Sequence, residues 1–84
     1  MNSQAQRLDM VSRQIQQRGI SVQQIVQAFQ TIPRHTFVPT AYEKYSYEDK
    51  SIVIGLNQTI SQPYTVALMT QILQLKPSIS VLEI

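Results

Sequence analysis

One turn in the middle of the chain has the residue types and the order of a binding site. Residues 58–64, Gln-Thr-Ile-Ser-Gln-Pro-Tyr, read as a loop that enters a helix, with Pro63 in the first helical turn. Ser61 stands just before that turn, where a hydroxyl and free backbone N–H groups together favour an anion. On the residue types alone, a plain N-cap is the favoured interpretation of Ser61.

Other side chains that could do chemistry lie between the second helix and the first strand that the sequence predicts. His35 follows Pro33-Arg34 and has no carboxylate nearby in sequence, so a surface or structural role is favoured over a general base. Arg34 either attracts a substrate carboxylate or contacts a helix C-terminus, and the sequence leaves both open. Three tyrosines favour helix packing over stacking on a peptide: Tyr42, Tyr45 and Tyr47.

The composition restricts the class of protein. The 84 residues suffice for one small domain, and 43% of them are hydrophobic while only 14% are charged. The basic residues lie singly along the chain, which argues against a nucleic-acid surface. The lack of cysteine excludes disulfides, thiolate zinc sites and cysteine nucleophiles, and one histidine cannot form a metal site by itself. Because no run of about 18 apolar residues and no apolar leader is present, we expect no membrane span and a cytoplasmic location.

Two amphipathic helices are predicted at the start of the chain. The first ends at Gly19, and its apolar residues at helical spacing are Leu8, Val11 and Ile15. The second begins behind a capping-box pattern of Ser21 and Gln24 and stops at Pro33. Its apolar face consists of Val22, Ile25, Val26 and Phe29.

A loop over residues 33–39 and a short third helix from about Thr40 follow. Residues 51–54 are β-branched and predict a strand that ends at Gly55. The helix after the 58–64 turn is expected to run to Lys76-Pro77. Its predicted core face consists of Leu68, Ile72 and Leu75, widened by Met69 and Leu73.

The chain ends with an apolar run, residues 79–84, that predicts a strand buried on both faces. We therefore expect an α/β fold in which residues 1–50 form a helical preface, and residues 51–84 hold the turn, a helix and the first strand of a parallel sheet. A buried strand that ends in an acid such as Glu83 usually feeds a glycine-rich loop. No such loop follows, so we expect a chain cut within a cofactor site, and whether it ends naturally at Ile84 stays open.

Several of these segments resemble the amino-terminal part of the protein-L-isoaspartate O-methyltransferase family. The shared features are Ile32-Pro33-Arg34, Phe37-Val38-Pro39, Ile54-Gly55, the 58–64 turn and Val81-Leu82-Glu83-Ile84. The turn is the specific part, whereas Leu56-Asn57 departs from a family in which Gln-Gly is frequent. The resemblance implies a class I (Rossmann-like) sheet and transfer of a methyl group from S-adenosyl-L-methionine to the free α-carboxylate of L-isoaspartyl residues in damaged proteins.

The same resemblance implies roles for single residues. Ser61 becomes the catalytic serine, which orients the acceptor carboxylate and is not a nucleophile. The strip that contacts the cofactor is Gln58, Thr59, Ile60, Ser61 and Thr65. Glu83 would orient the glycine-rich loop, and a solvated terminal residue is an equal alternative for it. Since the carboxylate is ionised at neutral pH and the sulfonium methyl group is already activated, such a site needs alignment and neither a base nor a metal.

A second class of function fits the same helices. The paired amphipathic helices would also suit a small protein-interaction module without catalysis, whereas the specific turn disfavours a regulatory domain of another methyltransferase. Under the enzyme interpretation we expect the 84-residue chain to be inactive alone, because the glycine-rich loop and the ribose-binding acid would follow Ile84. Substrate sequence preference and oligomeric state are not predicted.

Overall fold

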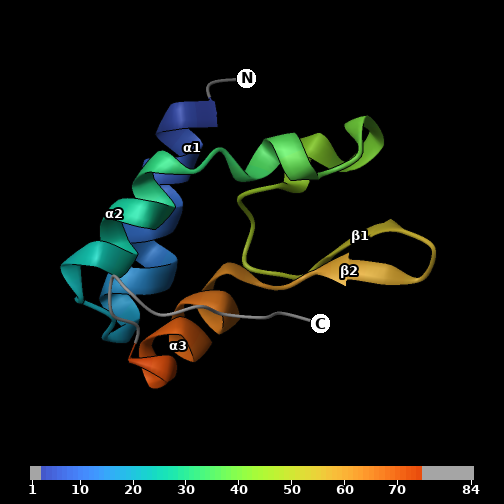
Figure 1. Cartoon of the computed structure of the whole chain (residues 1–84). Coiled ribbons are helices and arrows are strands. Elements are labelled where there is room, and N and C mark those ends of the chain that lie inside the picture. Colours follow the sequence, from blue (N-terminus) through green and yellow to red (C-terminus); the bar gives the residue numbers. More distant parts are fainter. Residues whose placement is uncertain (1–2, 75–84) are drawn as a thin grey trace.

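The computed structural model describes residues 3–74 and shows a helical body with a two-stranded hairpin beside it (Figure 1). The regular elements are α1 Ser3–Met10, α2 Gln23–Thr31, β1 Ile52–Gly55, β2 Gln58–Ile60 and α3 Pro63–Leu73. The chain is mostly helical, and its sheet is antiparallel. Within residues 3–74 no parallel pairing of strands occurs. The predicted final strand, residues 79–84, lies outside the described residues.

The first helix ends where its pattern predicts but is less regular than an α-helix. α1 continues into a π-helical segment, Val11–Ile15, and a 3₁₀ turn, Gln16–Arg18. Gly19 ends the run, as predicted, at a left-handed φ of 97° that suits glycine. The predicted apolar face is partly wrong, because Leu8 is 45% exposed and Met10 is buried instead. A π turn bonds residues i and i+5, so the α-helical spacing does not persist across it.

The second helix ends as predicted but begins differently. Ile32 has extended backbone before Pro33, at φ −76° and ψ 123°, so α2 cannot continue. The predicted capping box is wrong, because the N-cap residue is Val22 and no side chain caps the helix. Ser21 precedes that position by one residue and cannot serve it. The residues of α2 that face the core are Ile25, Val26 and Phe29.

The core lies where α2 and α3 meet the first helical run, which is α1 together with the π and 3₁₀ segments up to Arg18. It is formed by Met10, Val11, Ile15, Ile20, Ile25, Val26, Tyr47 and Ala67, with Phe29 and Tyr64 packed against it. Two 3₁₀ segments, Arg34–Phe37 and Thr40–Tyr45, lead from α2 towards the hairpin. The predicted third helix near Thr40 is therefore confirmed, with 3₁₀ geometry. Of the tyrosines, Tyr47 is buried and Tyr42 is exposed.

The hairpin corrects the prediction that residues 58–60 form a loop. β2 pairs with β1 through Ile52 opposite Ile60 and Val53 opposite Thr59. Gly55 ends β1, as predicted, opposite Gln58. The two residues between the strands, Leu56 and Asn57, both have positive φ, 50° and 60°. Positive φ at both positions of a two-residue loop is the geometry of a type I′ turn. The sequence did not predict this turn, because neither residue is the glycine that usually marks it.

Replacing Leu56 should stabilise the hairpin. Leu56 is 96% exposed and stands in the left-handed region, which a bulky side chain disfavours. Leu56→Asn is expected to raise the free energy of unfolding of the full-length gene product by about 0.5–1 kcal/mol, because asparagine tolerates this backbone. Urea unfolding measures the change, with Leu56→Ala as the control that removes the apolar side chain without favouring positive φ. Equal gains from both variants would contradict the backbone explanation.

α3 turns a different face to the core than its pattern predicts. Pro63 occupies its first turn, as predicted, and is buried together with Ala67. The predicted core residues Leu68, Met69, Ile72 and Leu73 are exposed. The helix ends at Leu73, with Gln74 in left-handed conformation, rather than at Lys76-Pro77. Ala67 packs in the core where α3 contacts the first helical run, and the longer apolar side chains lie on the outer face of α3.

Candidate functional site

A groove of about 1060 Å³ lies between α2, α3 and the hairpin. Apolar side chains form much of its wall: Ile25, Phe29, Ile32, Phe37, Ile54 and Ile60. Polar side chains at its surface include those of Arg34, Thr59, Ser61 and Thr70. No acidic side chain is among the lining residues of the described chain. The groove therefore combines apolar surface with hydroxyl groups and one cationic group, a combination that suits an anionic ligand.

The groove brings together three of the five residues predicted to contact a cofactor. Thr59, Ile60 and Ser61 line it in sequence, at the end of β2 and the entry to α3. Gln58 is exposed next to the hairpin turn and does not line it. Thr65 lies in the first turn of α3, where its hydroxyl donates a hydrogen bond to the Gln62 side chain at 3.2 Å. Glu83 lies outside the described residues.

Ser61 does not cap α3. The N-cap residue is Gln62, and no side-chain cap hydrogen bond is made there. The extended backbone of Gln62 before Pro63, with ψ at 138°, moves the helix start one residue beyond the predicted place. Ser61 is exposed, lines the groove and follows β2 directly. Its hydroxyl group is therefore not occupied by capping, in a residue that lines the groove.

Arg34 contacts the backbone of Ser61 and is buried, with 8% of its surface exposed. Its Nε donates a hydrogen bond to the Ser46 carbonyl at 2.6 Å, and its Nη2 donates one to the Ser61 carbonyl at 2.8 Å. Burial lowers the pKa of Arg34 from its ordinary value. The bond to Ser46, the C-cap residue of the 3₁₀ helix Thr40–Tyr45, is the helix C-terminal contact that one interpretation of Arg34 predicted. The bond to Ser61 was not predicted, since that carbonyl is 27 residues away in sequence. No spacing pattern marks such a contact.

A second cluster fixes the residue after Ser61. The Asp49 carboxylate accepts hydrogen bonds from the Arg18 guanidinium and from the Gln62 side-chain amide. These two donors, Arg18 first, hold the pKa of Asp49 below its ordinary value. The Arg18 guanidinium also lies over the Tyr64 ring, 5.3 Å from its centroid. The start of α3 is thus tied to the end of the first helical run.

His35 stands apart from the groove. Its Nδ1 lies 2.8 Å from the Tyr47 hydroxyl, and the two rings are 5.9 Å apart at a tilted angle. His35 is not among the residues that line the groove. This contact suits a histidine that supports packing, in line with the structural role that the sequence favoured.

Two further searches concern residues 3–74 alone. They hold no group of three histidine, cysteine or acidic side chains placed to bind a metal ion. Over the same residues, each helix is too short or too polar to cross a membrane.

Comparison with known proteins gives one consistent family. The model of the family described as Protein-L-isoaspartate(D-aspartate) O-methyltransferase matches residues 5–84. The chain is 49% identical over 81 residues to a Protein-L-isoaspartate O-methyltransferase of Herpetosiphon aurantiacus, covering 96% of this chain and 36% of the relative. It is 48% identical over 79 residues to the protein of that name from Methanoculleus marisnigri, covering 94% and 36%. For the protein from Flavobacterium psychrophilum the identity is 49% over 70 residues, covering 83% and 33%.

The chain spans about a third of the length of the relatives that it matches. The family model nevertheless covers nearly all of its residues, including those that form the groove. The chain therefore belongs to the protein-L-isoaspartate(D-aspartate) O-methyltransferase family.

Proposed function

We propose that the full-length gene product transfers a methyl group from S-adenosyl-L-methionine to the free α-carboxylate of L-isoaspartyl residues in damaged proteins. The observation that supports this most is the position of Ser61, which makes no capping hydrogen bond and lines a groove together with the buried Arg34 that bonds its carbonyl. Family membership supports the same reaction. The cytoplasm stays the proposed location.

The groups at the start of α3 suit an acceptor carboxylate. The Ser61 hydroxyl can donate a hydrogen bond to one carboxylate oxygen, because its proton is not used elsewhere in the described chain. The first-turn N–H groups of α3 and its positive dipole end favour the same negative charge. The Arg34 guanidinium adds a positive charge at the groove wall. Three separate effects thus favour an anion beside Ser61.

The chemistry requires alignment more than acid–base catalysis. When bound, S-adenosyl-L-methionine supplies a methyl group, whose bond to the sulfonium sulfur breaks as its bond to the carboxylate oxygen forms. No proton is transferred in this step, so the proposed site needs no general base. The proposed role of Ser61 is to hold the acceptor oxygen in line with the methyl group and the sulfonium sulfur. Good alignment of reacting groups can lower an activation free energy by as much as about 7–11 kcal/mol.

The described residues fit only part of a cofactor site. Thr59 and Ile60 line the groove next to Ser61, and we propose that these three residues contact the cofactor. Gln58 and Thr65 also remain proposed contacts, although neither lines the groove and the Thr65 hydroxyl already bonds Gln62. Among residues 3–74 the groove lining includes no carboxylate for ribose hydroxyls, so we propose that further cofactor contacts come from residues outside this range.

The alternative of an interaction module retains one supporting observation. The outer face of α3 exposes Leu68, Met69, Ile72 and Leu73, which suits contact with other protein surface. A methyltransferase could cover the same face within its own domain, so the exposed face fits both functions. Methylation of a peptide, which only the enzyme performs, separates them.

The test compares two peptides that differ in one linkage. The full-length gene product is incubated with S-adenosyl-L-methionine and a peptide that contains either an L-isoaspartyl or a normal L-aspartyl residue in the same sequence. We expect S-adenosylhomocysteine to form with the isoaspartyl peptide alone, and mass spectrometry to place the methyl group on its free α-carboxylate. Equal methylation of both peptides, or of neither, would reject the proposed function.

A further inference from the structure

The Arg34 side chain has an unusual set of partners for a buried cation. Its hydrogen bonds within residues 3–74 go to two backbone carbonyls, and no ion pair with an acidic side chain is formed there. Arginine is rarely buried without a paired charge, because removal of the guanidinium from water is unfavourable. Two neutral acceptors offset that penalty only in part. The two bonds are therefore the contacts that determine where this side chain lies.

The two carbonyls belong to separate parts of the chain. Ser46 follows the 3₁₀ helix Thr40–Tyr45, whereas Ser61 joins β2 to α3. The Nε and Nη2 atoms lie on one edge of the planar guanidinium, so both N–H bonds point the same way with fixed spacing. Arg34 thereby sets the place of the Ser61 carbonyl relative to Ser46. A lysine, with one nitrogen on a flexible chain, cannot reproduce this two-point contact.

Ser61 is held from its other side as well. The next residue, Gln62, donates to Asp49, which is paired with Arg18. With its carbonyl held by Arg34 and its neighbour held by Asp49, Ser61 has little freedom in its backbone φ and ψ angles. Its side chain then leaves the backbone in one direction, and here that residue lines the groove.

We propose that Arg34 is the positioning residue of the acceptor site: it fixes the Ser61 carbonyl and so directs the Ser61 hydroxyl towards the acceptor carboxylate. This inference rests on the proposed function, because it concerns the same reaction. Arg34 acts through Ser61 and needs no contact with the substrate. A displacement of about 1 Å at a reacting group is enough to lower a rate by around a hundredfold. Loss of the two bonds should therefore lower kcat even where the protein remains folded.

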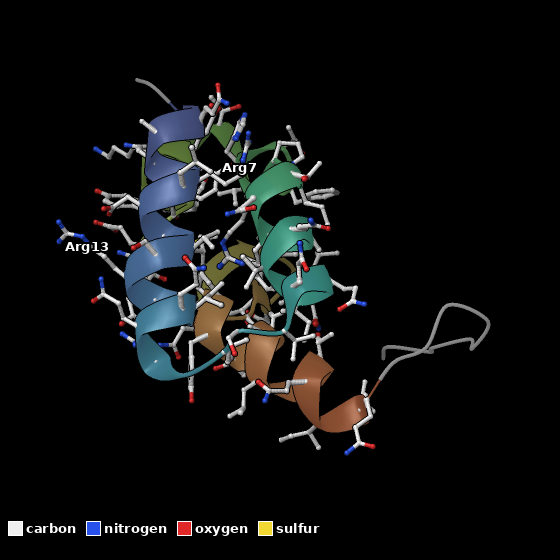
Figure 2. The ribbon with its side chains drawn as sticks, turned by 90° about the vertical axis from the view of Figure 1, so that its left-hand side faces the viewer. Arg7 and Arg13 are labelled. Carbon is white, nitrogen blue, oxygen red and sulfur yellow. The ribbon has the colours of Figure 1, made fainter. Side chains whose placement is uncertain are left out.

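The matched control is Arg7. Its Nε also donates to a backbone carbonyl, that of Gln30, at 2.8 Å, and it is partly buried. Figure 2 shows Arg7 between α1 and α2, whereas Arg13 points away from the body. Arg7 does not line the groove. Arg34→Lys and Arg7→Lys therefore remove the same kind of bond while retaining the charge, one at the site and the other away from it.

The first measurement separates turnover from stability in the full-length gene product. For Arg34→Lys we expect kcat for the isoaspartyl peptide to fall roughly tenfold or more at a temperature where circular dichroism shows full folding, with S-adenosylhomocysteine affinity retained. For Arg7→Lys we expect a lower Tm and a wild-type kcat. Arg34→Gln repeats the test without a buried ammonium if Arg34→Lys does not fold. A folded Arg34 variant with wild-type kcat would overturn the inference.

The second measurement asks whether Arg34 acts through Ser61. In the Ser61→Ala background, Arg34→Lys should change kcat by less than about twofold, because the hydroxyl that it positions is gone. Because Arg34→Lys keeps the positive charge, fold-losses that multiply would show an effect of the two-point contact that does not pass through the Ser61 hydroxyl, and would overturn the positioning role. A wild-type protein that does not methylate the isoaspartyl peptide would instead reject the proposed function, and this inference with it.

Discussion

Ser61→Ala should reduce the turnover of the full-length gene product by roughly ten- to a hundredfold, the effect of losing one hydrogen bond of about 1.5–3 kcal/mol to a charged group. Affinity for S-adenosylhomocysteine should stay within a few-fold, because the hydroxyl is proposed to orient the acceptor. Since Ser61 does not cap α3, Tm should not fall. Steady-state kinetics with the isoaspartyl peptide, isothermal titration with S-adenosylhomocysteine and thermal unfolding measure the three quantities.

Ser21 provides the matched control for that experiment. It is an exposed serine one residue before the N-cap of α2, as Ser61 is one residue before the N-cap of α3. Ser21→Ala should leave both turnover and Tm unchanged. Ser61→Thr keeps a hydroxyl but adds a methyl group, and it should retain more stability than activity. Wild-type turnover in Ser61→Ala would show that the catalytic assignment of Ser61 is wrong.

The 84-residue chain alone should show no methyl transfer and no saturable binding of S-adenosylhomocysteine. The groove holds Thr59, Ile60 and Ser61 but no acidic side chain to bind ribose hydroxyls, so the described residues supply only part of a cofactor site. The exposed face of α3, which includes Met69 and Ile72, should also cause the chain to self-associate. We expect a loss of activity below detection rather than a graded decrease.

Isothermal titration of the isolated chain, beside the full-length gene product, tests this prediction. Sedimentation velocity at several concentrations gives the state of association. Saturable binding with a micromolar Kd would contradict the view that essential cofactor contacts lie beyond the described residues. A monomer with a sharp, concentration-independent melting transition would contradict the expected self-association.

Local signals in the sequence predicted much of the helical body. Gly19 and Pro33 mark the ends of the first two helices, because each acts through its own backbone preference. Capping was predicted less well, since the helix start depends on φ and ψ of single residues such as Val22 and Gln62. Side-chain type alone does not determine those angles.

The hairpin and the outer face of α3 show where tertiary structure overrides pattern. β2 is only three residues long, and its turn lacks the glycine that usually marks a type I′ geometry. Leu68 and Ile72 have helical spacing yet lie outward, because Pro63 and Ala67 allow the closer approach of α3 to the core. Periodicity identifies an apolar face but does not say which protein surface covers it.

The sequence predicted the role of Ser61 in the candidate site but not all of the contacts of Arg34. Ser61 followed from the resemblance of its turn to a family motif. Arg34 lay within the same resemblance, and its bond to the C-cap residue Ser46 was one of its two predicted roles. Its bond to the Ser61 carbonyl leaves no trace in residue type or spacing. Contacts to backbone atoms place no constraint on the identity of the partner residue. Such contacts can be read only from coordinates.

The bonds of Arg34 also concern the order in which the site forms. They join positions 12 and 27 residues apart, so both require closure of long loops before they can form. The turn at residues 58–64 therefore does not carry its active arrangement as a separate peptide. Its arrangement depends on the packing of the segments around Arg34 and Ser46, so a change that loosens this packing would displace Ser61 even where the turn itself is intact.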